Sequence, residues 1–181
     1  SPKEIKKYSF SFFYIKLLLL RLVQTASFRM SKGIIFLHKY SKNQIMKYVK
    51  ETSAKIEVIP HGVNIKRKKI NQNFKNFRFI YISNIDYYKN QDFIIKSVNI
   101  FLNKYPEYKN KIFFEFYGSA YEPALKNMNN ILNNIENKKN FKYYGLKNQK
   151  FIFRNKKKNI VSLFSSSCEN FSVTLIEAMA L

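Results

Sequence analysis

The sequence predicts an α/β protein built on parallel β-sheets. Short apolar runs of strand length alternate along the chain with longer segments of helical pattern, and two of the runs, 111–118 and 141–145, end in a glycine. Strands that alternate with helices favour parallel sheets, because each helix returns the chain to the starting edge of the sheet. In such sheets ligands bind at the carboxyl ends of the strands, so those ends are where functional residues are sought.

The first part of the chain carries two predicted helices and two predicted strands. Residues 9–30 are leucine-rich and contain neither glycine nor proline, as a long helix requires. The apolar run 33–37 predicts a strand buried on both faces. Ser41 is placed to cap the next helix, and residues 55–60 form a second strand that ends in a proline. These elements predict a first domain over residues 1–62.

A lysine- and asparagine-rich stretch, 63–76, follows and marks the interdomain linker. The strand and helix patterns then begin again, which predicts a second domain over residues 77–181. Its elements are strands over 77–83, 111–118, 141–145 and 159–166, helices over 90–105 and about 121–136, a basic connector over 147–158, and a helix that begins near Ser172.

The net charge of +22 has two interpretations. A polyanion such as RNA, or an anionic lipid surface, is a natural partner of so basic a chain, and its 13 tyrosines and 18 phenylalanines could provide stacking platforms. However, the lysines are scattered through helices and loops alike, and most aromatic residues lie within apolar runs that suit a core. A compositional bias is therefore favoured, and a basic binding module without catalysis stays as the alternative function.

The sequence lacks the residues that several kinds of metal-binding and phosphate-binding site require. The chain has two aspartates, no cluster of cysteine and histidine at metal-ligand spacing, and neither of the common glycine-rich phosphate loops. We therefore expect no metal cofactor. A single cysteine, Cys168, cannot form an internal disulfide, which suits a reducing compartment. The apolar stretch around Leu17–Leu20 is interrupted by Lys16 and Arg21, which predicts a buried or interfacial helix rather than a membrane span.

Positive charge and carboxylates do follow the predicted strands. Lys89 comes after the strand 77–83, and the helix near Ser172 presents free N–H groups after the last strand, so that the two can hold a diphosphate. Glu169 precedes this helix and Glu177 lies within it. Carboxylates are good acceptors for sugar hydroxyls. A diphosphate between two hydroxylated groups describes a nucleotide sugar.

Four segments carry a resemblance to a known family. "SSSCENFSVTLIEAMA" resembles the Glu-x7-Glu segment of the retaining glycosyltransferases of group 1, which have the two-domain GT-B fold. The end of that family's first domain is similar to "SKGIIFLHKYSKNQIMKYV", and its entry into the second domain to "KIEVIPHGVN". The first strand, loop and helix of its second domain are similar to "FIYISNIDYYKNQDFIIKSV". The resemblance runs from about residue 26 to the terminus. It implies two Rossmann-like parallel-sheet domains, both incomplete here, and an internal fragment that is itself inactive.

The resemblance also implies roles for individual residues. Glu177 would bind the ribose hydroxyls, and Glu169 would contact the transferred sugar and favour positive charge at its anomeric carbon. Lys89 would neutralise the leaving diphosphate. Asn84 stands where the family frequently has an arginine, so half of the usual phosphate clamp is replaced.

The remaining candidates bind the donor through their backbone. Asn170, Phe171 and Ser172 fill a loop where the family often has glycines, and their amides would serve the phosphates. Gly62 and Gly118 would allow the backbone to approach the ligand or turn sharply. The implied partners are a nucleotide diphosphate-sugar donor and a glycan or lipid-linked acceptor, without nucleic acid. We expect a cytoplasmic protein with peripheral contact to the inner face of the cell membrane.

Overall fold

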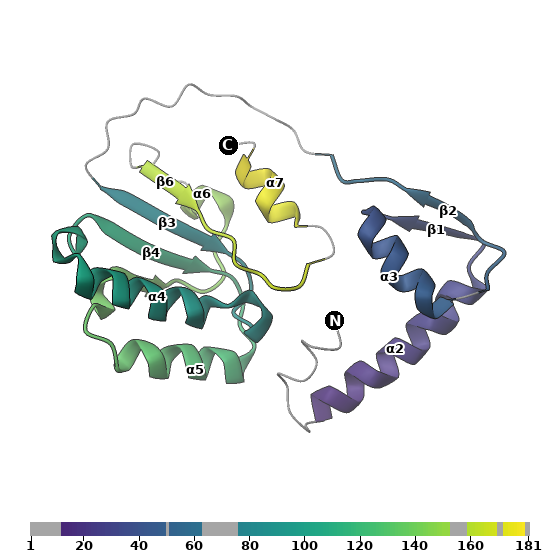
Figure 1. The fold of residues 1–181 in the computed structure, drawn as a ribbon, viewed down its shortest axis with the longest axis horizontal. Helices are drawn as coiled ribbons and strands as arrows, with labels where there is room; N and C mark the ends of the chain where they lie inside the picture. Colours follow the sequence, from purple (N-terminus) through teal and green to yellow (C-terminus); the bar gives the residue numbers. More distant parts are fainter. Residues whose placement is uncertain (1–11, 50, 63–75, 153–158, 170–171, 180–181) are drawn as a thin grey trace. The chain divides into compact units, whose positions relative to one another are not determined.

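A computed structural model of the chain describes residues 12–49, 51–62, 76–152, 159–169 and 172–179, and it shows an α/β protein with parallel sheets, as predicted (Figure 1). The chain divides into two compact units. The first unit comprises Ser1–Asn64 and Cys168–Val173, and the second comprises Ile65–Ser167 and Thr174–Leu181. The predicted linker 63–76 lies, apart from Asn76, outside the described residues. The predicted domain boundaries therefore stay predictions.

The first unit contains a two-stranded parallel sheet. Its elements are α2 (Phe12–Met30), β1 (Gly33–Phe36), α3 (Lys39–Val49) and β2 (Lys55–Val58). Gly33 pairs with Lys55 and Phe36 with Val58, so α3 is the crossover helix of a parallel pair. Phe28 of α2 stacks on Phe36, with ring centroids 6.2 Å apart, and this contact joins α2 to β1.

Two details of the first unit differ from the prediction. Ile34 and Phe36 of β1 are buried, but Gly33 and Ile35 are exposed, so the strand is buried on one face instead of two. An apolar run alone does not show whether a layer covers the second face of a strand. The helix α3 begins at Lys39, so Ser41 lies inside the first turn and is buried there instead of capping the helix.

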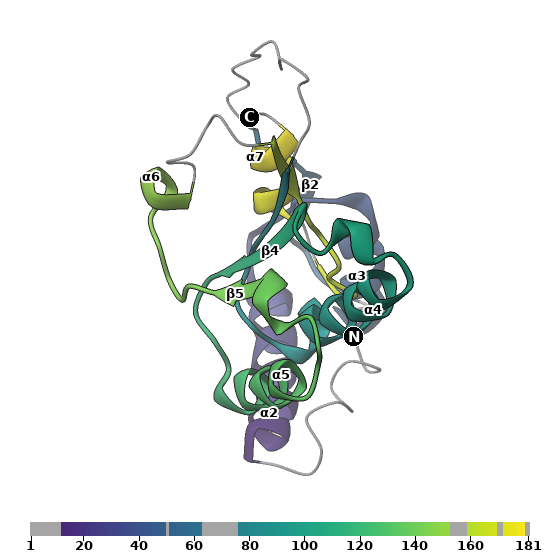
Figure 2. The same ribbon diagram turned by 90° about the vertical axis from the view of Figure 1, so that its left-hand side faces the viewer.

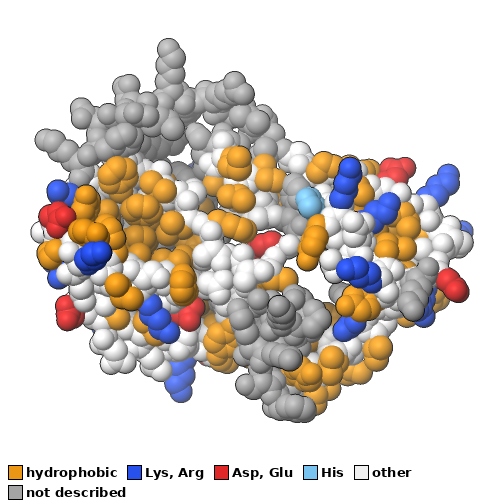
Figure 3. Space-filling model, in the orientation of Figure 1, with side chains coloured by type: hydrophobic (Ala, Val, Ile, Leu, Met, Phe, Trp, Pro, Cys, Tyr) orange, Lys and Arg blue, Asp and Glu red, His pale blue; other side chains and the backbone are white. Residues whose placement is uncertain are grey.

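The leucine-rich helix α2 exposes much of its apolar surface. Leu19, Leu22 and Val23 are between 58% and 69% exposed, and Figure 3 shows hydrophobic side chains along this helix at the lower right. Leu18 and Leu20 are also exposed, so the described unit does not bury this run in a core. Among the described residues no helix has the length and apolarity that crossing a bilayer requires.

The second unit contains a four-stranded, all-parallel sheet in the order β5-β4-β3-β6. The strands are β3 (Phe77–Ile82), β4 (Ile112–Tyr117), β5 (Phe141–Tyr143) and β6 (Asn159–Ser162). Phe77 pairs with Ile112 on one side and with Asn159 on the other, which places β3 inside the sheet. The predicted strands exist but are shorter than expected, most of all β6, whose expected last residues form an irregular segment.

Two amphipathic helices cover one face of this sheet. They are α4 (Gln91–Lys104) and α5 (Glu122–Asn133), which lie side by side in Figures 1 and 2. Ile95 and Leu102 of α4 and Met128 of α5 are buried against the strands. Phe79, Phe114 and Phe141 extend this core across three strands, with centroids 4.7 Å and 5.4 Å apart. These aromatic residues thus form a core, as their apolar context predicted.

The opposite face of the sheet carries a buried charge pair that the sequence did not indicate. Arg78 of β3 donates from Nε to Oε1 of Glu115 on β4 over 2.9 Å, and its Nη2 contacts the second carboxylate oxygen. The hydroxyl of Tyr117 donates to the same carboxylate. The hydrogen bond to Glu115 raises the pKa of Arg78, and burial, followed by the hydrogen bond to Glu115, raises the pKa of Tyr117.

One turn of helix, α6 (Gln149–Ile152), lies where a connector was predicted, and Ile152 packs on this second face with Ile80 and Tyr117. The last described element, α7 (Val173–Met179), begins one residue after the predicted position and buries none of its seven residues.

Candidate active site

Asn84 follows β3 at the carboxyl edge of the second unit's sheet, where the candidate residues were sought. Its side-chain oxygen accepts a hydrogen bond from the hydroxyl of Ser119, which follows β4, over 2.8 Å. Its main-chain oxygen accepts from Nε2 of the buried Gln91, also over 2.8 Å. Asn84 is therefore held between the ends of two adjacent strands while remaining exposed.

Gly118 brings these same two strand ends close together. Its φ angle is +144°, and a Cβ atom added to it would lie 2.2 Å from the main-chain oxygen of Ser83. No side chain fits in that space, so glycine is required here. The structure thus places Asn84 and Gly118, two of the predicted donor-binding residues, side by side.

Lys89 ends a short 3-10 helix, η2 (Tyr87–Lys89), just beyond β3. Asp86 caps this turn by accepting a hydrogen bond from the amide of Tyr87 over 2.7 Å. The ammonium of Lys89 lies 4.9 Å from the centroid of the Tyr88 ring. The main-chain oxygen of Lys89 accepts a hydrogen bond from the hydroxyl of Ser165, which follows β6. Lys89 is therefore tied to the end of a third strand.

The two glutamates fall in different units. Glu169 is exposed and belongs to the first unit, whereas Glu177 is exposed on α7 in the second unit together with Lys89. The distance of Glu169 from the other two residues is thus a matter of how the units are arranged. Ser172 is half-buried and directly precedes α7, and Asn170 and Phe171 lie outside the described residues.

Gly62 is exposed at the end of a described segment of the first unit. An added Cβ would meet no atom within 4 Å, so the described residues give no steric reason for glycine at this position. Its predicted contact with the donor stays a prediction. Among the described residues no group of three or more histidine, cysteine, aspartate or glutamate side chains is gathered as a metal site would need.

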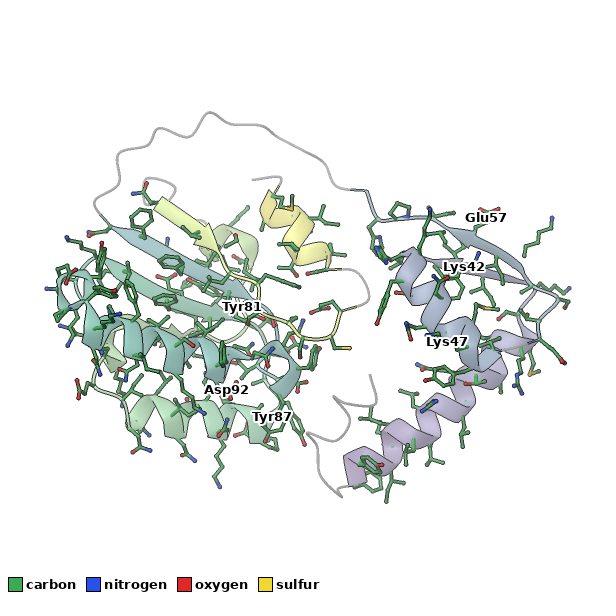
Figure 4. All side chains as sticks on the ribbon, in the orientation of Figure 1. Lys42, Lys47, Glu57, Tyr81, Tyr87 and Asp92 are labelled. Carbon is green, nitrogen blue, oxygen red and sulfur yellow. The ribbon has the colours of Figure 1, made fainter. Side chains whose placement is uncertain are left out.

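Sequence reasoning missed the residues that hold these candidates in place. Tyr81 of β3, near the strand's carboxyl end in Figure 4, donates from its hydroxyl to the main-chain oxygen of Lys89 over 2.7 Å. Asn90, Ser119 and Ser165 make the further bonds to this edge. The one available signal was the serine-rich stretch 165–167, but its first two residues were assigned to the predicted strand 159–166.

The chain is similar to known proteins over most of its length. The family model described as "Glycosyl transferases group 1" matches residues 63–181. No curated protein matches the chain.

Solved structures with the GT-B fold are similar to most of the chain. TarM is 17% identical with a TM-score of 0.64, over 87% of this chain and 30% of that protein. HepE from Anabaena, in complex with UDP, is 16% identical with a TM-score of 0.65, over 98% and 49%. The E. coli trehalose-6-phosphate protein bound with UDP-2-fluoro glucose is 13% identical with a TM-score of 0.66, over 82% and 43%.

At these identities the likeness concerns the fold, and the chain spans less than half the length of each of these proteins. The family model, in contrast, covers more than half of the chain, including every strand of the second unit and the segment with both glutamates. On that evidence the chain belongs to the group 1 glycosyl transferases.

Proposed function

We propose that the protein is a retaining glycosyltransferase that moves a sugar from a nucleotide diphosphate-sugar to a glycan or lipid-linked acceptor without a metal ion. The observation that carries this proposal is the meeting of Asn84, Gly118 and Lys89 at one edge of the parallel sheet. HepE in complex with UDP and the E. coli protein with UDP-2-fluoro glucose support the choice of donor.

In the proposed reaction the bond between the anomeric carbon and the diphosphate oxygen breaks, and its electron pair leaves with the diphosphate. The ammonium of Lys89 neutralises the negative charge that develops there, and the uncharged side-chain amide of Asn84 donates a hydrogen bond to the diphosphate. The carboxylate of Glu169 stabilises the positive charge at the anomeric carbon, and that of Glu177 accepts hydrogen bonds from the ribose. Such fixed charges are commonly the largest contribution to catalysis.

Retention means that the new bond to the acceptor oxygen forms on the face from which the diphosphate departs. The O–H bond of the acceptor hydroxyl breaks in the same step, and its proton passes to the departing diphosphate oxygen. NMR of the product should show the anomeric configuration of the donor, and an inverted product contradicts this part of the proposal. Turnover in EDTA should equal turnover in Mg²⁺ or Mn²⁺. A requirement for either cation contradicts metal independence.

The roles of the two glutamates can be distinguished by calorimetric titration of the complete protein with UDP. Glu177→Ala should weaken UDP binding about 10- to 100-fold, because charge-assisted hydrogen bonds to the ribose are lost. Glu169→Ala should leave UDP affinity unchanged, because UDP lacks the transferred sugar, yet should abolish most turnover of UDP-glucose. Glu107→Ala is the matched control, since this exposed glutamate precedes β4 at the opposite edge of the sheet.

If UDP, GDP and ADP all fail to bind and Glu177→Ala changes nothing, the enzyme proposal is wrong. Salt-sensitive binding of RNA or of anionic liposomes, unaffected by either glutamate substitution, favours the basic binding module instead. A lipid-linked acceptor would bring the protein to the inner face of the cell membrane, and co-sedimentation with liposomes that carry the acceptor tests that contact.

A further inference from the structure

The main-chain oxygen of Lys89 is held from two sides. The hydroxyl of Tyr81 donates to it over 2.7 Å, and the hydroxyl of Ser165 donates to it over the same distance. Tyr81 belongs to the core of the sheet and is only 2% exposed, so its hydroxyl is fixed by the packing of the ring. A carbonyl that accepts two such bonds leaves the backbone of Lys89 little freedom.

The residues on either side of Lys89 are bonded to the same serine segment. Nδ2 of Asn90 donates to the main-chain oxygen of Ser165 over 2.7 Å. The amide and the hydroxyl of Ser167 donate to the main-chain oxygen of Tyr88 over 2.8 Å and 3.0 Å. We call the residues Tyr81, Tyr88–Asn90, Ser165 and Ser167 the lysine clamp.

Asn90 also determines the backbone conformation within the lysine clamp. It lies in the left-handed region, with φ 58° and ψ 32°, the one residue other than glycine with a positive φ among those described. Asparagine tolerates this conformation better than most residues. In this conformation Asn90 connects η2 directly to α4, while its side-chain amide donates to Ser165.

We propose, building on the function proposed above, that the lysine clamp positions Lys89 for the departure of the diphosphate. Lysine has a long flexible side chain, so the reach of its ammonium depends on where its backbone is fixed. Tyr81, Asn90 and Ser165 are then positioning residues for the transfer step.

The test measures release of the nucleoside diphosphate by the complete protein from UDP-glucose, UDP-N-acetylglucosamine or whichever nucleotide sugar the wild type turns over fastest. Asn90→Gly permits the positive φ and removes the amide, and Tyr81→Phe removes one hydroxyl and keeps the ring. Each should lower kcat about 10- to 100-fold, because a displacement of 1 Å suffices for such a loss. KM for the donor should change little, because the affected charge acts mainly in the transition state.

The matched control is Tyr117→Phe, which removes an equally buried hydroxyl that donates to Glu115 within the sheet. Its kcat should stay close to that of the wild type. The decisive measurement repeats Tyr81→Phe and Asn90→Gly in a Lys89→Ala background. If the lysine clamp acts through Lys89, each substitution should there lower kcat much less than it does in the wild type.

Equal losses of kcat in both backgrounds, or a rise in KM alone, overturn the positioning role and leave the proposed transferase intact. A wild-type protein that releases no nucleoside diphosphate from any donor overturns the proposed function and the positioning role together. Ser165→Ala guards against misfolded variants, because this half-buried hydroxyl can be removed without a buried ring being disturbed. It should reproduce the loss of kcat.

Discussion

Gly118 is the residue at which backbone geometry restricts the candidate active site most tightly. Gly118→Ala should lower the free energy of unfolding by about 1–3 kcal/mol, because the new Cβ must move the main chain of Ser83 and the φ angle of +144° suits glycine alone. Urea denaturation measures this loss.

Alanine substitutions at Gly145 and Gly33 distinguish the effect of the steric clash from the effect of the positive φ angle. Gly145→Ala has the positive φ without a clash, and Gly33→Ala places its Cβ 3.9 Å from the nearest atom at an ordinary φ. The expected order of destabilisation is Gly118, Gly145, Gly33. A Gly118→Ala variant as stable as Gly33→Ala contradicts the described contact between the strand ends.

The hydroxyl of Tyr117 should make stability depend on pH in the alkaline range. Burial and the hydrogen bond to Glu115 raise its pKa in the folded state, so the folded protein holds this proton more tightly than the unfolded chain does. Its contribution is complete below the ordinary tyrosine pKa of about 10 and is lost as pH rises above it. The stability difference between wild type and Tyr117→Phe should therefore shrink above about pH 10, and a constant difference contradicts the assignment.

At the scale of residues, the sequence indicated which positions end strands but not which side chains support them. Asn84, Gly118 and Lys89 follow apolar runs, so their place at the sheet edge was predictable. Tyr81 lies inside such a run and looks like any core residue. Hydrogen bonds from side chains to distant main-chain oxygens leave no spacing pattern, because the partner can be any residue type.

Among the elements, the turn before β4 and the start of β5 depend on one buried side chain. Nδ2 of Asn140 donates to the main-chain oxygens of Lys109 and Ile112, each over 2.7 Å, and Asn140 is 1% exposed. Asn140→Ala should lower the free energy of unfolding by about 1–3 kcal/mol, since two carbonyls lose their donor. Asn134→Ala, which removes an exposed amide, should change it by less than about 0.5 kcal/mol in thermal or urea denaturation. Equal effects contradict the role of Asn140.

Element types were predicted better than element surroundings. Each predicted strand exists, because apolar runs bounded by polar or glycine residues are a local signal. Whether other elements cover each face of a strand depends on residues far away in the sequence. For that reason β1 was expected to be buried on both faces. The charge pair of Arg78 and Glu115 was equally invisible, because the two residues are 37 positions apart and meet only through the register of β3 with β4.

Over the whole molecule, 33 basic against 11 acidic side chains should cause self-repulsion in the folded state. Raising NaCl from about 20 to 300 mM shortens the screening length to well below 10 Å and should raise the melting temperature by several degrees in differential scanning calorimetry. UDP-free protein is used, so that a bound anion does not mask the effect. A melting temperature that falls over this range contradicts net repulsion.

The family and its fold could be predicted from about residue 26 onward, because four separate segments in the right order carried the resemblance. The arrangement of Glu169 with Lys89 and Glu177 could not, because it depends on how two units meet and not on a pattern within either. The identities of the donor and the acceptor could not be predicted either, because they depend on side-chain contacts that form only when the ligand is bound.

The strand order β5-β4-β3-β6 has a consequence for synthesis on the ribosome. One side of β3 can pair with β4 soon after both have emerged, but its other side must wait for β6, which is made about 80 residues later. At ordinary translation rates this interval lasts roughly 4–15 s. A nascent chain with so long an open edge is a natural client for a chaperone, and slower codons placed after β3 would extend its exposure to aggregation.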